Sequence, residues 1–120
     1  MFEIPVGDLL TTFTGDSREL EFEGEILPGF YDDLEFSSPL YLKIKLISLD
    51  DGIMVVFEKI KATVEFEGTL NFVDLENIER EFKKTYDISN PDDIKYIDMK
   101  NISIDLKDVI REEILITCIN

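Results

Sequence analysis

Carboxylates are the most abundant chemical groups in this chain, and pairs of them could act as general acid and base or bind a divalent cation. The sequence holds 27 Asp and Glu against 12 Lys and Arg, and it has no His. Adjacent pairs occur at Asp50-Asp51 and Asp92-Asp93, where Mg²⁺ or Ca²⁺ could bind, but neither segment has the spacing of a calcium loop. Both pairs stand in turn-forming segments, which favours a structural role for them.

The residue types that most enzymes use near neutral pH are missing or isolated. Without His to move protons, and with Cys118 as the single cysteine, the common Ser-His and Cys-His nucleophilic sites cannot be assembled. One cysteine also excludes an internal disulfide and a cysteine-based zinc site. Carboxylate-only catalysis, as in glycosidases, is an alternative, although abundant Glu provides such pairs by chance. We therefore expect a protein that is not an enzyme and holds no cofactor or metal.

A row of glutamates is one candidate binding surface. Between Arg18 and Ile26 charged and apolar residues alternate, which is typical of a strand with one buried and one solvent-exposed face. The exposed face is expected to carry the carboxylates of Glu19, Glu21, Glu23 and Glu25. Because the net charge is -15, this row would suit a basic partner, or it would simply keep a small domain in solution.

The middle of the chain predicts a β-hairpin with an irregular second strand. Residues 40–47 alternate in polarity, and residues 50–52 supply a tight turn before a second apolar run. In that run the apolar parity changes between Phe57 and Ile60. A β-bulge near Glu58 would absorb the change and bend the strand.

The same hairpin predicts a second candidate surface made of lysines. If both strands send their aliphatic residues inward, four lysines point outward on one face: Lys43, Lys45, Lys59 and Lys61. This group could contact RNA phosphate or an acidic partner surface. The alternative is a solvated sheet face on which the lysines pair across strands with Glu58 or Glu65.

Beyond the hairpin, residues 72–86 fit two structures. Leu75, Ile78 and Phe82 have helical spacing, whereas Ile78, Phe82 and Tyr86 also share the parity of a strand. The pattern leaves helix and strand open.

The clearest helix is C-terminal. Asp105 can cap a helix whose apolar stripe is formed by Leu106, Val109, Ile110 and Ile114. We expect one domain over residues 1–120 in the α+β class, mainly β. Its architecture would be a curved antiparallel sheet or a partly closed barrel with this one C-terminal helix, and a short helical turn near residues 6–11. The opening residues have no signal-peptide pattern and no window is long enough for a membrane span, so we expect a cytoplasmic protein without membrane contact.

The order of these parts resembles the YceD family, named for large ribosomal RNA subunit accumulation. The resemblance covers most of the chain from about Leu40 onward and includes GIMVVFEKIKATVEFEG and, near the C-terminus, ISIDLKDVIREEILIT. Its most specific piece is IDL at 104–106 followed by VIRE at 109–112. The opening EIPVGDLL is also similar to the family's N-terminal strand and short turn.

The resemblance implies a non-enzymatic factor in large ribosomal subunit assembly or in accumulation of large-subunit rRNA. Many members carry a Cys-x-x-Cys after the long strand, but this chain has no Cys near residues 67–70, so we expect no metal knuckle. The acid surplus favours a basic ribosomal protein or assembly factor as partner, with direct contact to large-subunit rRNA left open. The alternative is a generic acidic interaction module for a basic partner. Neither hypothesis includes a small-molecule substrate.

Overall fold

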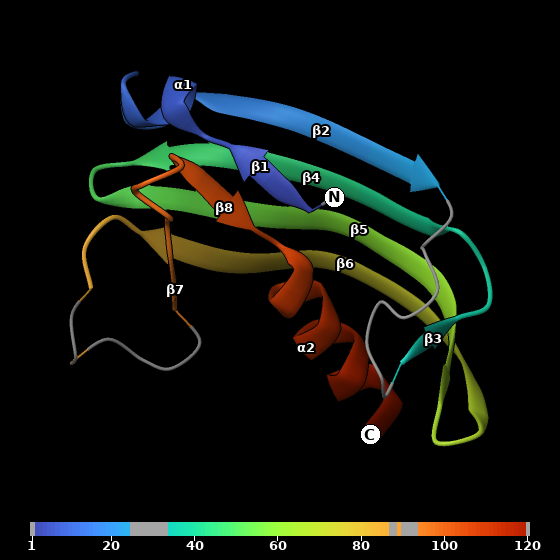
Figure 1. Cartoon of the computed structure of the whole chain (residues 1–120). Helices are drawn as coiled ribbons and strands as arrows, with labels where there is room; N and C mark the ends of the chain where they lie inside the picture. Colours follow the sequence, from blue (N-terminus) through green and yellow to red (C-terminus); the bar gives the residue numbers. More distant parts are fainter. Residues whose placement is uncertain (1, 25–33, 87–88, 90–93, 120) are drawn as a thin grey trace.

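The chain folds into a curved β-sheet, a two-stranded ribbon and a C-terminal helix (Figure 1). The computed structural model describes residues 2–24, 34–86, 89 and 94–119. The elements follow in the order β1 (Glu3–Pro5), α1 (Gly7–Leu10), β2 (Ser17–Gly24), β3 (Glu35–Phe36), β4 (Leu40–Leu49), β5 (Gly52–Phe66), β6 (Thr69–Lys83), β7 (Lys95–Tyr96), β8 (Ser103–Asp105) and α2 (Lys107–Ile119). This is the mainly β fold with a C-terminal helix that the sequence predicts, and α1 is the predicted short turn.

The main sheet is open and is not closed into a barrel. Its strands follow the order β2-β4-β5-β6-β7, and β3 pairs with the end of β5 away from the hairpin turn. Neighbouring strands are antiparallel except β6 and β7, which pair in parallel. The predicted hairpin is confirmed, because Asp50 and Asp51 join β4 to β5 and Leu49 pairs with Gly52. Of the two expected forms, the open curved sheet is the one that forms.

A bulge bends β5 where the sequence predicts one. The register between β4 and β5 shifts between Lys43 and Ile44, since Glu58 is an extra residue in β5. In β6 the buried face changes parity at the same level, at Asn77, whose φ of 54° lies in the left-handed region. Asn adopts that region more readily than most residues do. The two irregularities keep apolar side chains on one face of both strands and increase the bend.

Most of residues 72–86, for which the sequence pattern fits both a helix and a strand, belongs to β6. Its bulge explains the helical spacing, because Leu75 and Ile78 both pack against the core although they lie three residues apart. A strand that changes parity therefore imitates one helical repeat. Tyr86 lies beyond the strand, with its ring centroid 5.1 Å from that of Tyr96.

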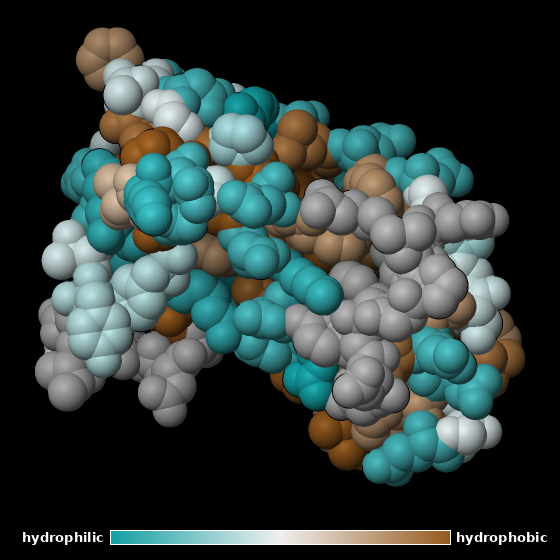
Figure 2. All heavy atoms as spheres, in the orientation of Figure 1, coloured by the Kyte–Doolittle hydropathy of each residue, from teal (hydrophilic) through white to brown (hydrophobic). Residues whose placement is uncertain are grey.

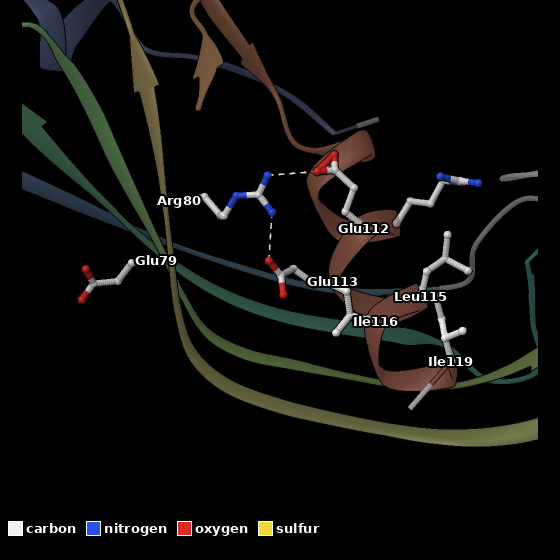
Figure 3. A pocket seen from close by; sticks show the side chains of 8 residues that line it. Glu79, Arg80, Glu112, Glu113, Leu115, Ile116 and Ile119 are labelled. Atoms are coloured by element: carbon white, nitrogen blue, oxygen red, sulfur yellow. Dashed lines mark hydrogen bonds and ion pairs between the residues drawn. The ribbon is translucent and has the colours of Figure 1, made fainter. Parts of the chain in front are cut away.

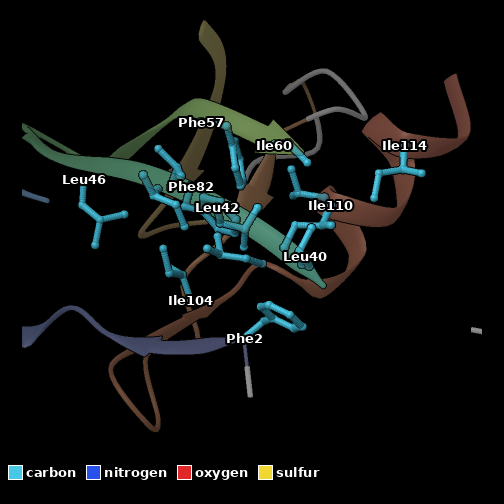
Figure 4. Close-up of a cluster of buried hydrophobic side chains, with 14 of the residues drawn as sticks. Phe2, Leu40, Leu42, Leu46, Phe57, Ile60, Phe82, Ile104, Ile110 and Ile114 are labelled. Carbon is cyan, nitrogen blue, oxygen red and sulfur yellow. The ribbon is translucent and has the colours of Figure 1, made fainter. Parts of the chain in front are cut away.

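Helix α2 covers one face of the main sheet, which we call the inner face, and the opposite face is the outer face. The backbone N–H of Lys107 donates to Asp105 Oδ1 at 2.9 Å, the capping contact that the sequence predicts. Val109, Ile110 and Ile114 are fully buried against side chains of the sheet (Figure 4). Burial of this stripe supplies the main force that holds the helix on the sheet.

The short ribbon connects the two ends of the described chain. β1 pairs antiparallel with β8, which places the N-terminal segment beside the start of α2. The hydroxyl of Ser48 donates to the carbonyl of Leu9 at 2.7 Å and so fixes α1 to β4. The pair Asp92-Asp93, which the sequence predicts to lie in a turn, is outside the described residues. Neither helix in the described part of the chain is long and apolar enough to cross a membrane.

Candidate interaction surfaces

The outer face of the main sheet carries acid on its outer strands and lysine on its central strands. The register aligns Glu21 of β2 with Lys43 of β4, Lys43 with Lys59 of β5, and Lys59 with Glu76 of β6. The side chains in this row across the four strands are therefore acidic, basic, basic and acidic in turn. Cross-strand neighbours of opposite charge stabilise a sheet modestly, while the overall charge of such a face stays mixed.

The four candidate lysines share this face but do not form one tight cluster. Lys43 and Lys59 are direct cross-strand neighbours, whereas Lys45 lies opposite Val56 and Lys61 lies opposite Tyr41. Lys43 and Lys61 are exposed, and Lys45 and Lys59 are partly buried. Phosphate binding depends on clustered cations, so this spacing weakens the case for an RNA-binding surface.

Lys59 is already engaged by two carboxylates. Its Nζ lies 2.5 Å from Asp74 Oδ1 and 2.8 Å from Glu76 Oε1. The hydrogen bonds with Asp74 and Glu76 raise the pKa of Lys59, and the bond with Lys59 lowers the pKa of Asp74. The expected partners Glu58 and Glu65 were wrong for this lysine, because the register places β6 carboxylates directly beside it. Within the described residues, no ion pair joins the other three candidate lysines to a carboxylate.

The glutamate row lies on β2, an outer strand of the sheet. Glu19, Glu21 and Glu23 are exposed and alternate with the partly buried Leu20 and Phe22, as the sequence predicts. In the part of the chain that the structure describes, none of the three makes an ion pair. Their carboxylates can be approached from the outer face and from the edge of the sheet. The fourth member of the predicted row, Glu25, lies outside the described residues.

The aspartates of the β4–β5 turn have structural partners. Thr14 Oγ1 donates to Asp50 Oδ1 at 2.5 Å, and Lys83 Nζ lies 2.8 Å from Asp51 Oδ2. The hydrogen bond with Lys83 lowers the pKa of Asp51. Asp50 and Asp51 therefore act as turn residues. Among the described residues, no three Cys, Asp or Glu side chains are grouped closely enough to hold a metal ion.

The inner face contains an arginine that sequence reasoning missed. Arg80 of β6 is only 9% exposed, and its Nη1 lies 2.9 Å from Glu113 Oε1 and its Nη2 3.0 Å from Glu112 Oε1 of α2 (Figure 3). Glu112 also binds Lys95 Nζ at 2.8 Å through its other oxygen. The sequence offers one weak signal, since Arg80 shares parity with Ile78 and Phe82.

These contacts hold Glu112 and Arg80 in their charged forms. Burial acts to raise the pKa of Glu112, but hydrogen bonds with Lys95 and Arg80 outweigh it and lower that pKa. Burial likewise acts to lower the pKa of Arg80, and its bonds with Glu112 and Glu113 raise it instead. A general acid needs a raised pKa, so Glu112 is suited to binding α2 to the sheet and not to proton transfer.

A groove of about 550 Å³ lies beside this network, between β6 and α2. Its lining includes Glu79 and Arg80 of β6 and Glu113, Leu115, Ile116 and Ile119 of α2. Figure 3 shows Glu79 pointing away from the helix while Arg80 points toward it. Brown hydrophobic atoms reach the surface around the C-terminal end of α2 (Figure 2), where Ile116 is 52% and Ile119 69% exposed. We call this feature the α2 groove.

In comparisons with known proteins, no family model, no curated protein and no solved structure matches the chain. The similarity to the YceD family stays a prediction from the sequence motifs.

Proposed function

We propose that this protein is a non-enzymatic binding module that recognises a basic protein through the glutamate row of β2. The observation that carries the proposal is the exposure of Glu19, Glu21 and Glu23 on an outer strand without ion pairs among the described residues. On the same face but toward the other edge of the sheet, Asp74 and Glu76 of β6 are partly neutralised by Lys59. The β2 row therefore offers three neighbouring carboxylates on the outer face that no ion pair neutralises within the described residues.

A net charge of -15 adds a long-range contribution to this local one. Such a charge speeds the approach of a basic partner and disfavours an acidic one or bare nucleic acid. The resemblance to the YceD family suggests the setting, which is assembly of the large ribosomal subunit in the cytoplasm. The partner would be a basic ribosomal protein or another assembly factor.

Affinity capture from the protein's own cells at low and moderate salt tests this proposal. Tagged wild-type protein is compared with a variant in which Glu19, Glu21 and Glu23 are replaced by Gln. A matched control carries the same charge change at other exposed positions, which are Glu35 and Glu65 of the sheet and Glu67 of the β5–β6 turn. We expect wild type and control to recover large-subunit proteins and the row variant to lose them. Equal recovery by all three proteins, or recovery of no large-subunit component by any of them, would refute the proposal.

Direct contact with large-subunit rRNA is the second candidate function, and it is favoured by the exposure of Lys43 and Lys61. Replacing Lys43, Lys45 and Lys61 with Gln should then reduce rRNA recovery and flatten its salt dependence, while protein recovery persists. Unchanged rRNA recovery would remove these lysines from the mechanism.

A further inference from the structure

Among the described residues, nothing pairs with the outer edge of β6 over most of its length. On one side β6 pairs with β5 from Thr69 to Lys83, and on the other side its described pairing is limited to β7 at Phe82 and Lys83 (Figure 1). An unpaired edge presents backbone donors and acceptors that can template another strand. We call the open stretch next to β7 the β6 edge.

The β7 contact shows which backbone groups face this edge. Ile97 N–H donates to the carbonyl of Lys83 at 2.9 Å, so the polar groups of Lys83 point outward from the sheet. Backbone groups of alternate residues in a strand point to the same side. The N–H and C=O groups of Glu81 and Glu79 therefore face the same open edge, in line with β7.

The α2 groove runs beside this edge and would receive side chains from an added strand. Side chains of successive residues in a strand point to opposite faces. One set from an added strand would enter the groove near Ile116 and Ile119, whose exposed surfaces are apolar. The other set would lie on the outer face beside Glu79 and Glu81. An alternating apolar and basic segment fits both faces at once.

The negative charge beside the β6 edge favours a cationic segment over a second copy of this chain as the added strand. Glu79 is exposed and makes no ion pair within the described residues, and Glu81 shares Lys83 with Asp51. A second copy paired antiparallel through this edge would set these glutamates against their own counterparts, and like charges directly opposite are destabilising. Both copies would also carry a net charge of -15. A cationic segment meets neither penalty.

We propose that the β6 edge binds an extended, cationic segment of a partner protein as an additional strand. Apolar side chains of the segment lie in the α2 groove, and its Lys or Arg side chains lie beside Glu79 and Glu81. This surface is separate from the glutamate row of β2 and does not depend on the role of that row. Main-chain hydrogen bonds supply affinity in this binding mode, and the side-chain pockets supply specificity.

A labelled decapeptide of alternating Val and Lys is a suitable probe, with binding measured by fluorescence anisotropy. Its matched control has the same side chains and charge but N-methylated backbone amides, which cannot donate to β6. Each lost backbone hydrogen bond should weaken binding about fivefold to tenfold. We expect the unmodified peptide to bind, and the methylated peptide to bind at least tenfold more weakly. Similar affinity for the two peptides, or no binding of either, overturns the proposal.

Two variants locate the site on the chain. Glu79→Pro removes one outward N–H without removing a hydrogen bond to β5, and Glu79→Gln removes the same charge but keeps the N–H. We expect the Pro variant to bind the unmodified peptide about fivefold to tenfold more weakly than the Gln variant. Circular dichroism checks that the Pro variant is folded, and if it is not, the peptide comparison on wild type decides. Equal affinities of the Pro and Gln variants for the peptide would refute binding at the β6 edge. A wild-type dimer in sedimentation that Glu79→Pro abolishes would show instead that the edge pairs with a second copy of the chain.

Discussion

Replacing Arg80 with Met tests whether the buried ion network holds α2 on the sheet. Removing one partner of a fully buried ion pair costs about 3–5 kcal/mol, because a charge is left uncompensated. Glu113 is only 16% exposed and would lose Arg80, its ion-pair partner, whereas Glu112 is 34% exposed and keeps Lys95. The cost therefore falls mainly on Glu113. Met retains much of the packing of the arginine stem, so we expect a loss of about 2–3 kcal/mol.

Urea unfolding at pH 7, followed by far-UV circular dichroism, measures this loss. The midpoint should fall while the slope stays constant, since the same surface is exposed on unfolding. A chain of this size has an unfolding entropy of about 2.1 cal/mol/K per residue, so the melting temperature should fall by about 8–12 °C. Lys59→Met is a matched control, because it also removes a cation with two carboxylate partners but does so on the solvated outer face. Its midpoint should stay close to that of wild type.

A second substitution tests the stated cause. If the stranded charge of Glu113 is responsible, Arg80→Met combined with Glu113→Gln should be at least as stable as Arg80→Met alone. Coincident unfolding curves for wild type and Arg80→Met would refute the reasoning, because the network would then make no net contribution. A further loss in the double variant would show that Glu113 has another partner of equal importance.

Three further predictions concern pH and backbone geometry. Glu112 has a folded pKa below its ordinary value of 4.5, so its contribution to stability is present above pH 4.5 and is lost as the pH falls through the folded pKa. Glu112→Gln should therefore flatten the pH dependence of the urea midpoint below about pH 4.5. Gly52→Ala should cost about 2–3 kcal/mol in urea unfolding, because its methyl group would collide with the carbonyl of Phe82, whereas Gly7→Ala has room and should change little. Asn77→Val should cost about 1–2 kcal/mol by the same assay and Asn77→Gly should be nearly neutral, since φ is 54° there.

Local patterns in the sequence were sufficient for the parts of the fold that depend on neighbouring residues. The β4–β5 hairpin follows from alternation around a two-residue turn, and the bulge follows from the parity change before Ile60. The C-terminal helix follows from its stripe and from the capping oxygen of Asp105. In each case the pattern and the interaction that it predicts lie within a few residues of each other.

Contacts between distant segments were not predictable in this way. Arg80 meets Glu113 across 33 positions, and Ser103 meets Glu3 across 100 positions. Nothing near Arg80 indicates a buried carboxylate partner, because the partner depends on where α2 crosses the sheet. The same holds for the glutamate and lysine candidates. Their face was predictable from alternation, but the engagement of Lys59 by Asp74 depends on the register between β5 and β6.

Arg80 fixes α2 to the inner face of β6. Its guanidinium pairs with Glu112 and Glu113 of α2 on the inner face of β6. The outward backbone groups of Glu79 and Glu81 belong to the β6 edge, and Glu79 also lines the α2 groove. Arg80 and Glu79 are adjacent in sequence but point to opposite faces, so their roles can be separated. Arg80→Met should lower stability, whereas Glu79→Gln should weaken the binding of a cationic strand and leave the urea midpoint unchanged.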